Sequence, residues 1–183
     1  MLSKSLLVFM AASTVAATPA QSAPTEVEGA ALATYEAACL ATAVAEQGIA
    51  GWARETGASK ADVAEYKDLV VGNHTQVWRS LDPSHRIYVA LGERLGCTVW
   101  FQTRQPDVAK EAFRKMVQSE IRKTDSSVAE VSVYRDEAVS PHLSVLSYVV
   151  RFRSERVGLM WSVYISTARS PAVVFYEAAR VRH

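Results

Sequence analysis

Four segments with alternating side chains in the last third of the chain constrain its fold more than any other feature. They span residues 128–135, 143–153, 159–167 and 173–182. In the second segment Leu146, Tyr148 and Val150 recur at every other position, which is typical of a β-strand. The connections between the segments are short, and short connections join strands that run antiparallel. The sequence therefore predicts an antiparallel meander at the C-terminal end.

Two further strands are expected earlier in the chain. Residues 85–91 and 97–102 alternate in the same way, and Gly92 and Gly96 mark the turn between them. Because both faces of this hairpin are largely apolar, we expect it to be covered on both sides or to lie within a curved sheet. The predicted sheet then has about six strands.

Helices are predicted before the hairpin and between the hairpin and the meander. They comprise residues 25–47, a segment capped by residues 59–62 that ends before Gly72, a short helix within residues 73–81, and residues 106–123. Thr25 begins a capping box, Gly48 is a stop signal, and Pro106 suits the first position of a helix. The predicted fold class is therefore α+β, with N-terminal helices and one later helix packed on a curved antiparallel sheet.

This order of elements is similar to that of the cone-shaped α+β domains of the nuclear-transport-factor-2-like class. A profilin-like or cystatin-like packing of helices on a sheet gives much the same order. The similarity covers the chain in outline from about residue 23 onward, and it rests on topology rather than on a motif. It implies a fold and no particular function, because such scaffolds host both enzymes and binding modules.

The first residues are typical of a cleavable secretion signal. Lys4 is the only charged residue among the first 25, and the apolar residues 6–12 and then small residues up to Ala23 follow it. Cleavage sites with small residues follow Ala17, Ala20 and Ser22. The apolar stretch is too short to span a bilayer comfortably, although a retained membrane anchor is the alternative interpretation.

We therefore expect residues 1–22 to be removed, by a cut between residues 17 and 23, and residues 23–183 to form one globular domain. The short, alanine-rich leader favours a bacterial source. The expected location is the periplasm or the medium, with no stable membrane insertion after the signal is removed.

Cys39 and Cys97 are the two cysteines of the chain. In an oxidising compartment an even pair is readily joined. Cys39 lies on the apolar stripe of the first predicted helix and therefore faces the core. We predict a disulfide between the first helix and the second strand. Two buried thiols are the alternative if the chain is not exported.

The charge balance argues against partners that are bound through bulk charge. Without Lys4, the 20 basic residues become 19, which equals the 19 acidic residues, so the exported chain has a net charge of zero. Nucleic acids and anionic lipids are usually bound by an excess of basic residues. Neither is therefore expected as a partner.

Arginines in the last strands form one candidate binding surface. Arg151 and Arg153 are two positions apart, as are Arg180 and Arg182, so each pair lies on one side of its strand. Burial of four unpaired guanidinium groups would be prohibitive. We therefore expect these arginines to face solvent or an acidic partner.

Two other side chains are candidates for unusual surroundings. Trp100 alternates with the apolar Val99 and Phe101, which places it outside the main core and makes it a candidate binding residue. Glu177 is one of few carboxylates in the predicted strands and has mainly apolar neighbours. A salt bridge to a strand arginine is the commoner fate of such a residue.

The sequence assigns no catalytic residue, metal ligand or cofactor. Asp82, Ser84 and His85 lie together, but neighbours in sequence seldom reach the geometry of a catalytic triad. They are interpreted as turn residues around Pro83. The four histidines of the chain have no spacing that is typical of a metal site.

The favoured function is that of an exported, non-enzymatic binding or interaction protein of the bacterial periplasm. This description includes an inhibitor of an envelope enzyme, an immunity-type protein and a carrier of a small ligand. The expected partner is an envelope protein or a small apolar or aromatic ligand, and homodimer formation is left open. The alternatives are a small enzyme with acid–base residues in a cone-shaped pocket and a structural homo-oligomer of the envelope.

Removal of the signal is a direct test of the predicted export. The intact mass of the protein from its native host is expected to show the loss of 17 to 23 residues, since the cleavage sites fall there. A full-length mass in the membrane fraction would contradict the prediction.

Overall fold

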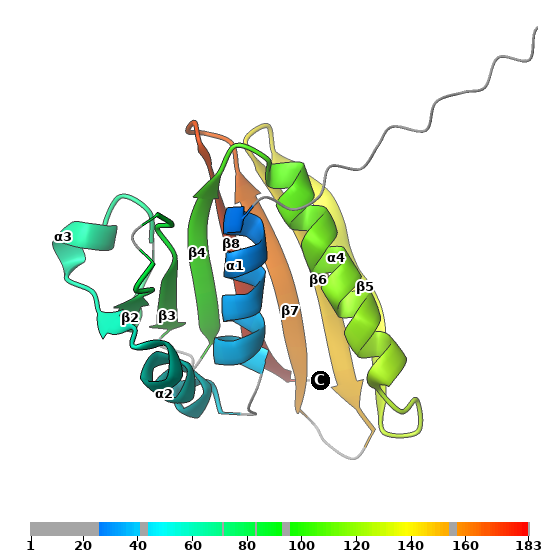
Figure 1. The fold of residues 1–183 in the computed structure, drawn as a ribbon. Helices are drawn as coiled ribbons and strands as arrows, with labels where there is room; N and C mark the ends of the chain where they lie inside the picture. The colour runs from blue at the N-terminus through cyan, green and yellow to red at the C-terminus, as the bar shows by residue number, and fades with distance from the viewer. Residues whose placement is uncertain are drawn as a thin grey trace, which may run out of the picture.

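An antiparallel sheet of eight strands organises the protein (Figure 1). The structure is a computed structural model that describes residues 26–40, 44–70, 72–82, 84–92, 96–153 and 157–182. The predicted secretion signal lies outside the described residues. The strands are β1 Ser59–Lys60, β2 His74–Arg79, β3 Tyr88–Gly92, β4 Cys97–Thr103, β5 Ala129–Ser140, β6 Leu143–Phe152, β7 Val157–Ser166 and β8 Ala172–Arg182.

The predicted α+β class, with helices packed on an antiparallel sheet, is confirmed. The predicted number of about six strands is wrong, because the sheet has eight strands in the order β1-β2-β3-β4-β8-β7-β6-β5. The sheet is also open, with β1 at one edge and β5 at the other, and it is not closed into a cone. Of the two additional strands, β2 lies in a segment predicted as helical, and β1 lies in the residues predicted to cap the second helix.

Strand β8 lies at the centre of the sheet, between β4 and β7. The chain leaves β4, crosses one face of the sheet as a helix, and returns through the meander β5-β6-β7-β8 until β8 pairs with β4. The predicted meander is therefore confirmed. Its last strand, β8, pairs with β4 and so joins the meander to the earlier strands of the sheet.

The longer helices cover one face of the sheet, which is called the helix face below (Figure 1). The helical segments are α1 Glu26–Tyr35, the π-helix η1 Glu36–Leu40, α2 Ala45–Thr56, α3 Val63–Tyr66 and α4 Pro106–Lys123. The prediction for α4 is confirmed at both ends, with Pro106 at its first position. No helix in the described part of the chain has the length and apolar character needed to cross a membrane.

The prediction of one helix that ends at Gly48 is wrong. The α-helical geometry of α1 ends at Tyr35, and the next residues form the π-helix η1. A separate helix, α2, then runs through Gly48 to Thr56. Ile49 and Trp52 of α2 are buried in the core. Their burial outweighs the cost of about 1 kcal/mol for a glycine inside a helix. The helix ends instead at Gly57, whose φ of 71° is left-handed.

The predicted short helix within residues 73–81 is wrong as well, because this segment forms β2. Trp78 packs into the core on the helix face, whereas Val77 packs into a second cluster. Adjacent side chains point to opposite faces in a strand but not in a helix, so burial on both sides of the sheet selects the extended conformation. Only Val63–Tyr66 of the preceding segment is helical, behind a capping box of Asp62 and Glu65.

The main core lies between the helices and the sheet. At its centre the ring of Tyr176 stacks on Phe113 and lies against Tyr35 and Phe101. The Tyr176 hydroxyl donates a hydrogen bond to the backbone oxygen of Ala109, at 3.3 Å. Burial raises the pKa of the Tyr35 and Tyr176 hydroxyls, so both stay neutral within the core. These contacts join α1 and α4 to the central strands.

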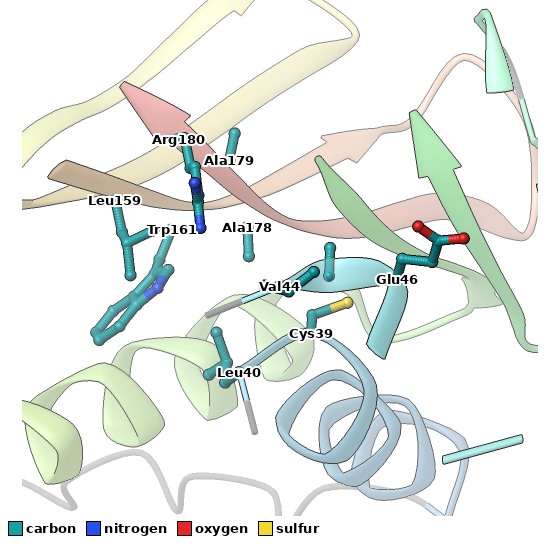
Figure 2. A pocket seen from close by; sticks show the side chains of 10 residues that line it. Cys39, Leu40, Val44, Glu46, Leu159, Trp161, Ala178, Ala179 and Arg180 are labelled. Atoms are coloured by element: carbon teal, nitrogen blue, oxygen red, sulfur yellow. The ribbon is translucent and has the colours of Figure 1, made fainter. Parts of the chain in front are cut away.

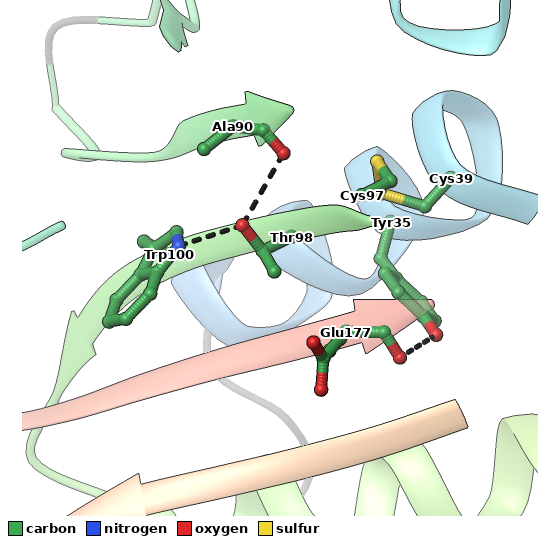
Figure 3. The surroundings of a disulfide bond; sticks show 7 residues. All are labelled: Tyr35, Cys39, Ala90, Cys97, Thr98, Trp100 and Glu177. Atoms are coloured by element: carbon green, nitrogen blue, oxygen red, sulfur yellow. Dashed lines mark hydrogen bonds between the residues drawn. A yellow bond between two sulfur atoms is a disulfide. The ribbon is translucent and has the colours of Figure 1, made fainter. Parts of the chain in front are cut away.

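The predicted disulfide between Cys39 and Cys97 is present in the structure (Figure 3). It joins η1 to β4 across a separation of 58 residues, with the two Cα atoms 5.4 Å apart. One turn earlier, the Tyr35 hydroxyl donates a hydrogen bond of 2.8 Å to the backbone oxygen of Glu177 in β8. The helical segment is thus fixed to both central strands.

Loss of the disulfide is expected to lower the free energy of unfolding by about 2–5 kcal/mol, because the unfolded chain then gains conformational freedom. Urea unfolding of a Cys39→Ser/Cys97→Ser variant, compared with the oxidised wild type, measures this change. Unfolding in the presence of reductant is the control. Reductant is expected to lower the stability of the wild type and to leave that of the variant unchanged. Two alkylatable thiols in the native protein would contradict the predicted bond.

Candidate functional site

An apolar cavity lies on the helix face between η1, the start of α2, and strands β7 and β8 (Figure 2). Its volume is about 250 Å³. The described residues that line it are Cys39, Leu40, Val44, Ala45, Glu46, Leu159, Trp161, Ala178, Ala179 and Arg180. We call this site the η1 pocket. Most of its wall is apolar, as is usual for sites that bind small molecules.

The strand side of the η1 pocket follows from the register of the sheet. Ala178 of β8 is aligned with Trp161 of β7 on one side and with Cys97 of β4 on the other. The small side chain of Ala178 therefore lies between two larger residues and leaves space above the sheet. Figure 2 shows Trp161 and Leu159 beside this space.

The helical side of the η1 pocket comes from the π-helix. Cys39 and Leu40 are its last two residues, and both line the pocket. Segments of π-helix are rare and occur frequently at functional sites. The disulfide holds Cys39 against β4, so this wall is attached covalently to the sheet.

The indole nitrogen of Trp161 is an unusual polar group in this wall. The side chain is 8% exposed, and its N–H has no hydrogen-bond partner among the described residues. A buried donor without an acceptor is unfavourable by about 1–3 kcal/mol. The nitrogen is itself shielded from solvent. A ligand acceptor therefore reaches this N–H only when the lining shifts slightly.

Two charged residues of opposite sign lie on the lining of the η1 pocket. Glu46 is at the start of α2, and Arg180 is near the end of β8. The described lining therefore carries no net charge. A largely neutral ligand suits it better than a strongly charged one.

The predicted arginine surface is not assembled on a single face of the sheet. Arg151 is exposed and aligned with Glu130, on the face opposite the helices. Arg180 is aligned with Leu159, whose side chain packs against the main core, and it therefore lies on the helix face. Arg153 follows the end of β6 and donates a hydrogen bond to the backbone oxygen of Ser126. The side chain of Arg182 lies outside the described part of the chain.

Trp100 lies on the face opposite the helices, as its position in the strand predicts. It is buried in the second cluster, where its ring stacks on Phe175 with centroids 4.1 Å apart. Its indole N–H donates a hydrogen bond of 2.9 Å to Thr98 (Figure 3). Leu69 and Val70, which follow α3, belong to the same cluster. Trp100 thus packs within a small second core.

Glu177 lies beside Thr98 and Ser162 on the same face, in a row of polar residues that crosses the central strands. Burial raises the pKa of its carboxyl, and a hydrogen bond from the Tyr164 hydroxyl opposes this shift. Ser162 is fully buried and accepts a hydrogen bond of 2.8 Å from the Ser147 hydroxyl. The expectation that Glu177 has unusual surroundings therefore agrees with the structure, although the residue lies outside the η1 pocket.

A buried acid ties α1 to the sheet. Glu28 is fully buried, and one of its carboxyl oxygens accepts a hydrogen bond from the Thr103 hydroxyl of β4. The other oxygen has no partner among the described residues. Glu28 and Thr103 border a hollow of about 360 Å³ that is also lined by Arg104. No local pattern predicts this contact, because it depends on how α1 lies on the sheet.

Asp82, Ser84 and His85 do contact one another, but not as a catalytic triad does. The Asp82 carboxylate accepts a hydrogen bond of 2.5 Å from the Ser84 hydroxyl and lies 3.0 Å from Nδ1 of His85. Ser84 Oγ is 3.3 Å from the same nitrogen. A triad uses different ring nitrogens for its acid and its nucleophile. The group is therefore a hydrogen-bonded turn, in which the bonds from Ser84 lower the pKa of Asp82.

Within the described residues, no three potential ligands gather in a way that could hold a metal ion.

Glu177 is expected to make stability fall as pH rises. The folded state binds its proton more tightly than the unfolded chain, whose carboxyl titrates near the ordinary value of 4.5. Above that pH the unfolded chain loses its proton first, and the free energy of unfolding decreases until the pH passes the raised pKa. Glu177→Gln removes this dependence. Urea unfolding from pH 4 to pH 8 measures the difference between the two proteins.

The matched control is Glu130→Gln, because Glu130 is exposed and lies on the same face. If the stability difference between Glu177→Gln and the wild type is constant over this range, the folded state does not perturb Glu177.

Comparison with protein-family models, with curated proteins and with solved structures found no match to this chain.

Proposed function

We propose that this protein is an exported binding protein that holds a small, largely apolar ligand in the η1 pocket. The observation that carries the proposal is the pocket itself, since a mainly apolar cavity with few polar groups is the usual form of a small-molecule site. Its volume of about 250 Å³ lies slightly below the range of roughly 300–1,000 Å³ for such sites. The ligand is therefore expected to be small, with one or two rings or a short chain.

The lining supports binding rather than catalysis. Cys39 is held in the disulfide and is not a free nucleophile, and Glu46 and Arg180 are the titratable residues of the described lining. Acid–base catalysis needs a proton donor or acceptor within hydrogen-bond reach of the reacting atoms. Leu40, Leu159 and Trp161 offer apolar contact instead.

The polar groups of the lining favour a particular ligand. The Trp161 N–H lacks an acceptor among the described residues, and a ligand with a carbonyl or ether oxygen would supply one once a small shift of the lining exposes the nitrogen. The charges of Glu46 and Arg180 balance each other. A neutral aromatic or aliphatic molecule with one acceptor therefore fits the site best.

The disulfide and the leader support export as part of the proposal. Disulfides persist mainly in oxidising compartments such as the periplasm. The predicted signal at residues 1–22 would deliver the chain there. A soluble carrier or sensor of a small molecule agrees with both features.

Binding of the neutral fluorescent ketone prodan tests the proposal. Its naphthalene ring suits the apolar wall, and its carbonyl is an acceptor whose hydrogen bonding alters the emission. We expect saturable binding, with the emission of prodan shifted to the blue relative to water because the cavity is mainly apolar. Ala178→Phe is expected to weaken binding at least about tenfold, because the larger ring fills the space beside Trp161.

Ala50→Phe is the matched control, since Ala50 is exposed on α2 and is not among the lining residues. It is expected to bind prodan as the wild type does. Thermal melting of both variants verifies that they are folded. Equal binding by folded Ala178→Phe, or no binding by the wild type, would contradict the proposed site.

A further inference from the structure

Strand β5 forms one edge of the sheet and has β6 as its partner within the described part of the chain. Its second half, residues 133–140, is exposed throughout. The edge of a strand presents N–H and C=O groups that can pair with another strand. Edge strands are therefore common sites for the addition of a strand from a partner.

Exposed apolar side chains are concentrated at this edge. The large hydrophobic residues that are exposed in the described chain are Val44, Val63, Leu81, Ile121, Val128, Val133, Tyr134 and Val139. Three of them belong to β5, where Val133 is 60%, Tyr134 63% and Val139 50% exposed. Val128 directly precedes the strand. An exposed apolar edge of this kind favours pairing with another strand.

The sequence of β5 is complementary to itself around Asp136. If two copies pair antiparallel about a two-fold axis at Asp136, Arg135 of each copy lies opposite Glu137 of the other. In the same register Tyr134, at one of the irregular positions of β5, lies opposite Ala138, whereas Val133 and Val139 lie at the ends of the paired segment. Opposite charges and apolar pairs that face each other across strands are stabilising.

The orientation of the charged side chains agrees with this register. Arg135 Nε and Glu137 Oε1 of one chain are 3.0 Å apart, which places both on the same side of β5. They are aligned with Ser147 and Val145 of β6, on the face opposite the helices. In a pair of copies each of these residues therefore has an opposite charge beside it on the neighbouring strand.

Asp136 would lie opposite its own copy, but its charge is already compensated. Its carboxylate is 2.6 Å from Lys110 Nζ and 3.2 Å from Arg114 Nη2, both in α4. The hydrogen bond from Lys110 lowers the pKa of Asp136. Two such carboxylates can approach at the axis, because each is paired with the basic residues of its own α4.

Irregularities in the pairing with β6 limit the length of the contact. They fall at Tyr134 and Val139 and bound the regular segment Arg135–Ala138. Bulges shorten the part of an edge that can pair. The contact is therefore expected to be short and of moderate affinity.

We propose that the partner of the β5 edge is a second copy of this chain, paired antiparallel about Asp136 so that Arg135 of one copy faces Glu137 of the other. This inference goes beyond the proposed ligand binding, since β5 contributes no residue to the described lining of the η1 pocket.

Sedimentation equilibrium of the purified protein, from micromolar to hundreds of micromolar, tests the proposal. We expect a reversible dimer. Arg135→Glu places like charges opposite each other and is expected to weaken the dimer at least about tenfold. The double variant Arg135→Glu/Glu137→Arg restores opposite charges across the axis and is expected to recover wild-type affinity. Both residues are exposed, so thermal melting is expected to be unchanged.

Crosslinking tests the register separately. A cysteine at the axis lies opposite itself, so Asp136→Cys is expected to form a disulfide-linked dimer on mild oxidation. Ala138→Cys is the control, because in this register it faces Tyr134 of the other copy. A monomer at all concentrations, a dimer that is insensitive to Arg135→Glu, or equal crosslinking by both cysteine variants would overturn the proposal.

Discussion

The attachment of η1 to the two central strands is the constraint on which the rest of the structure depends. The Cys39–Cys97 disulfide fixes η1 to β4, and the hydrogen bond from Tyr35 fixes the preceding turn to the backbone of Glu177 in β8. These contacts hold the helical segment at a set height above the sheet (Figures 1 and 3). The η1 pocket lies beside this attachment, so the wall that η1 contributes is preformed rather than assembled when a ligand arrives.

Much of the fold follows from local patterns in the sequence. Helix α4 has a proline at its first position and a single apolar stripe, and the meander strands alternate, so both could be predicted. The disulfide could be predicted as well, because the chain offers one pair of cysteines. The segments around Gly48 and Trp78 could not, since their conformation depends on distant strands that bury Ile49, Val77 and Trp78.

The candidate site was largely hidden from the sequence. Cys39 was predicted to face the core, and Arg180 was predicted as a surface residue, but nothing local connects them with Trp161 or Ala178. The pocket exists because the register of β7 and β8 puts a small residue beside a large one beneath the π-helix. The small side chain of Ala178 in a central strand is the one hint of a pocket in the sequence. It indicates a pocket only when the register shows which larger residues lie beside it.

The indole N–H signals in a nitrogen–proton correlation spectrum test the central claim most directly. The chain has four tryptophans, and the signal of Trp161 is identified by its loss in Trp161→Phe. On titration with prodan, the Trp161 signal is predicted to shift saturably while the signal of Trp100, in the second cluster, stays in place. A shift of Trp100 with an unchanged Trp161 would contradict the account and place the ligand on the opposite face of the sheet.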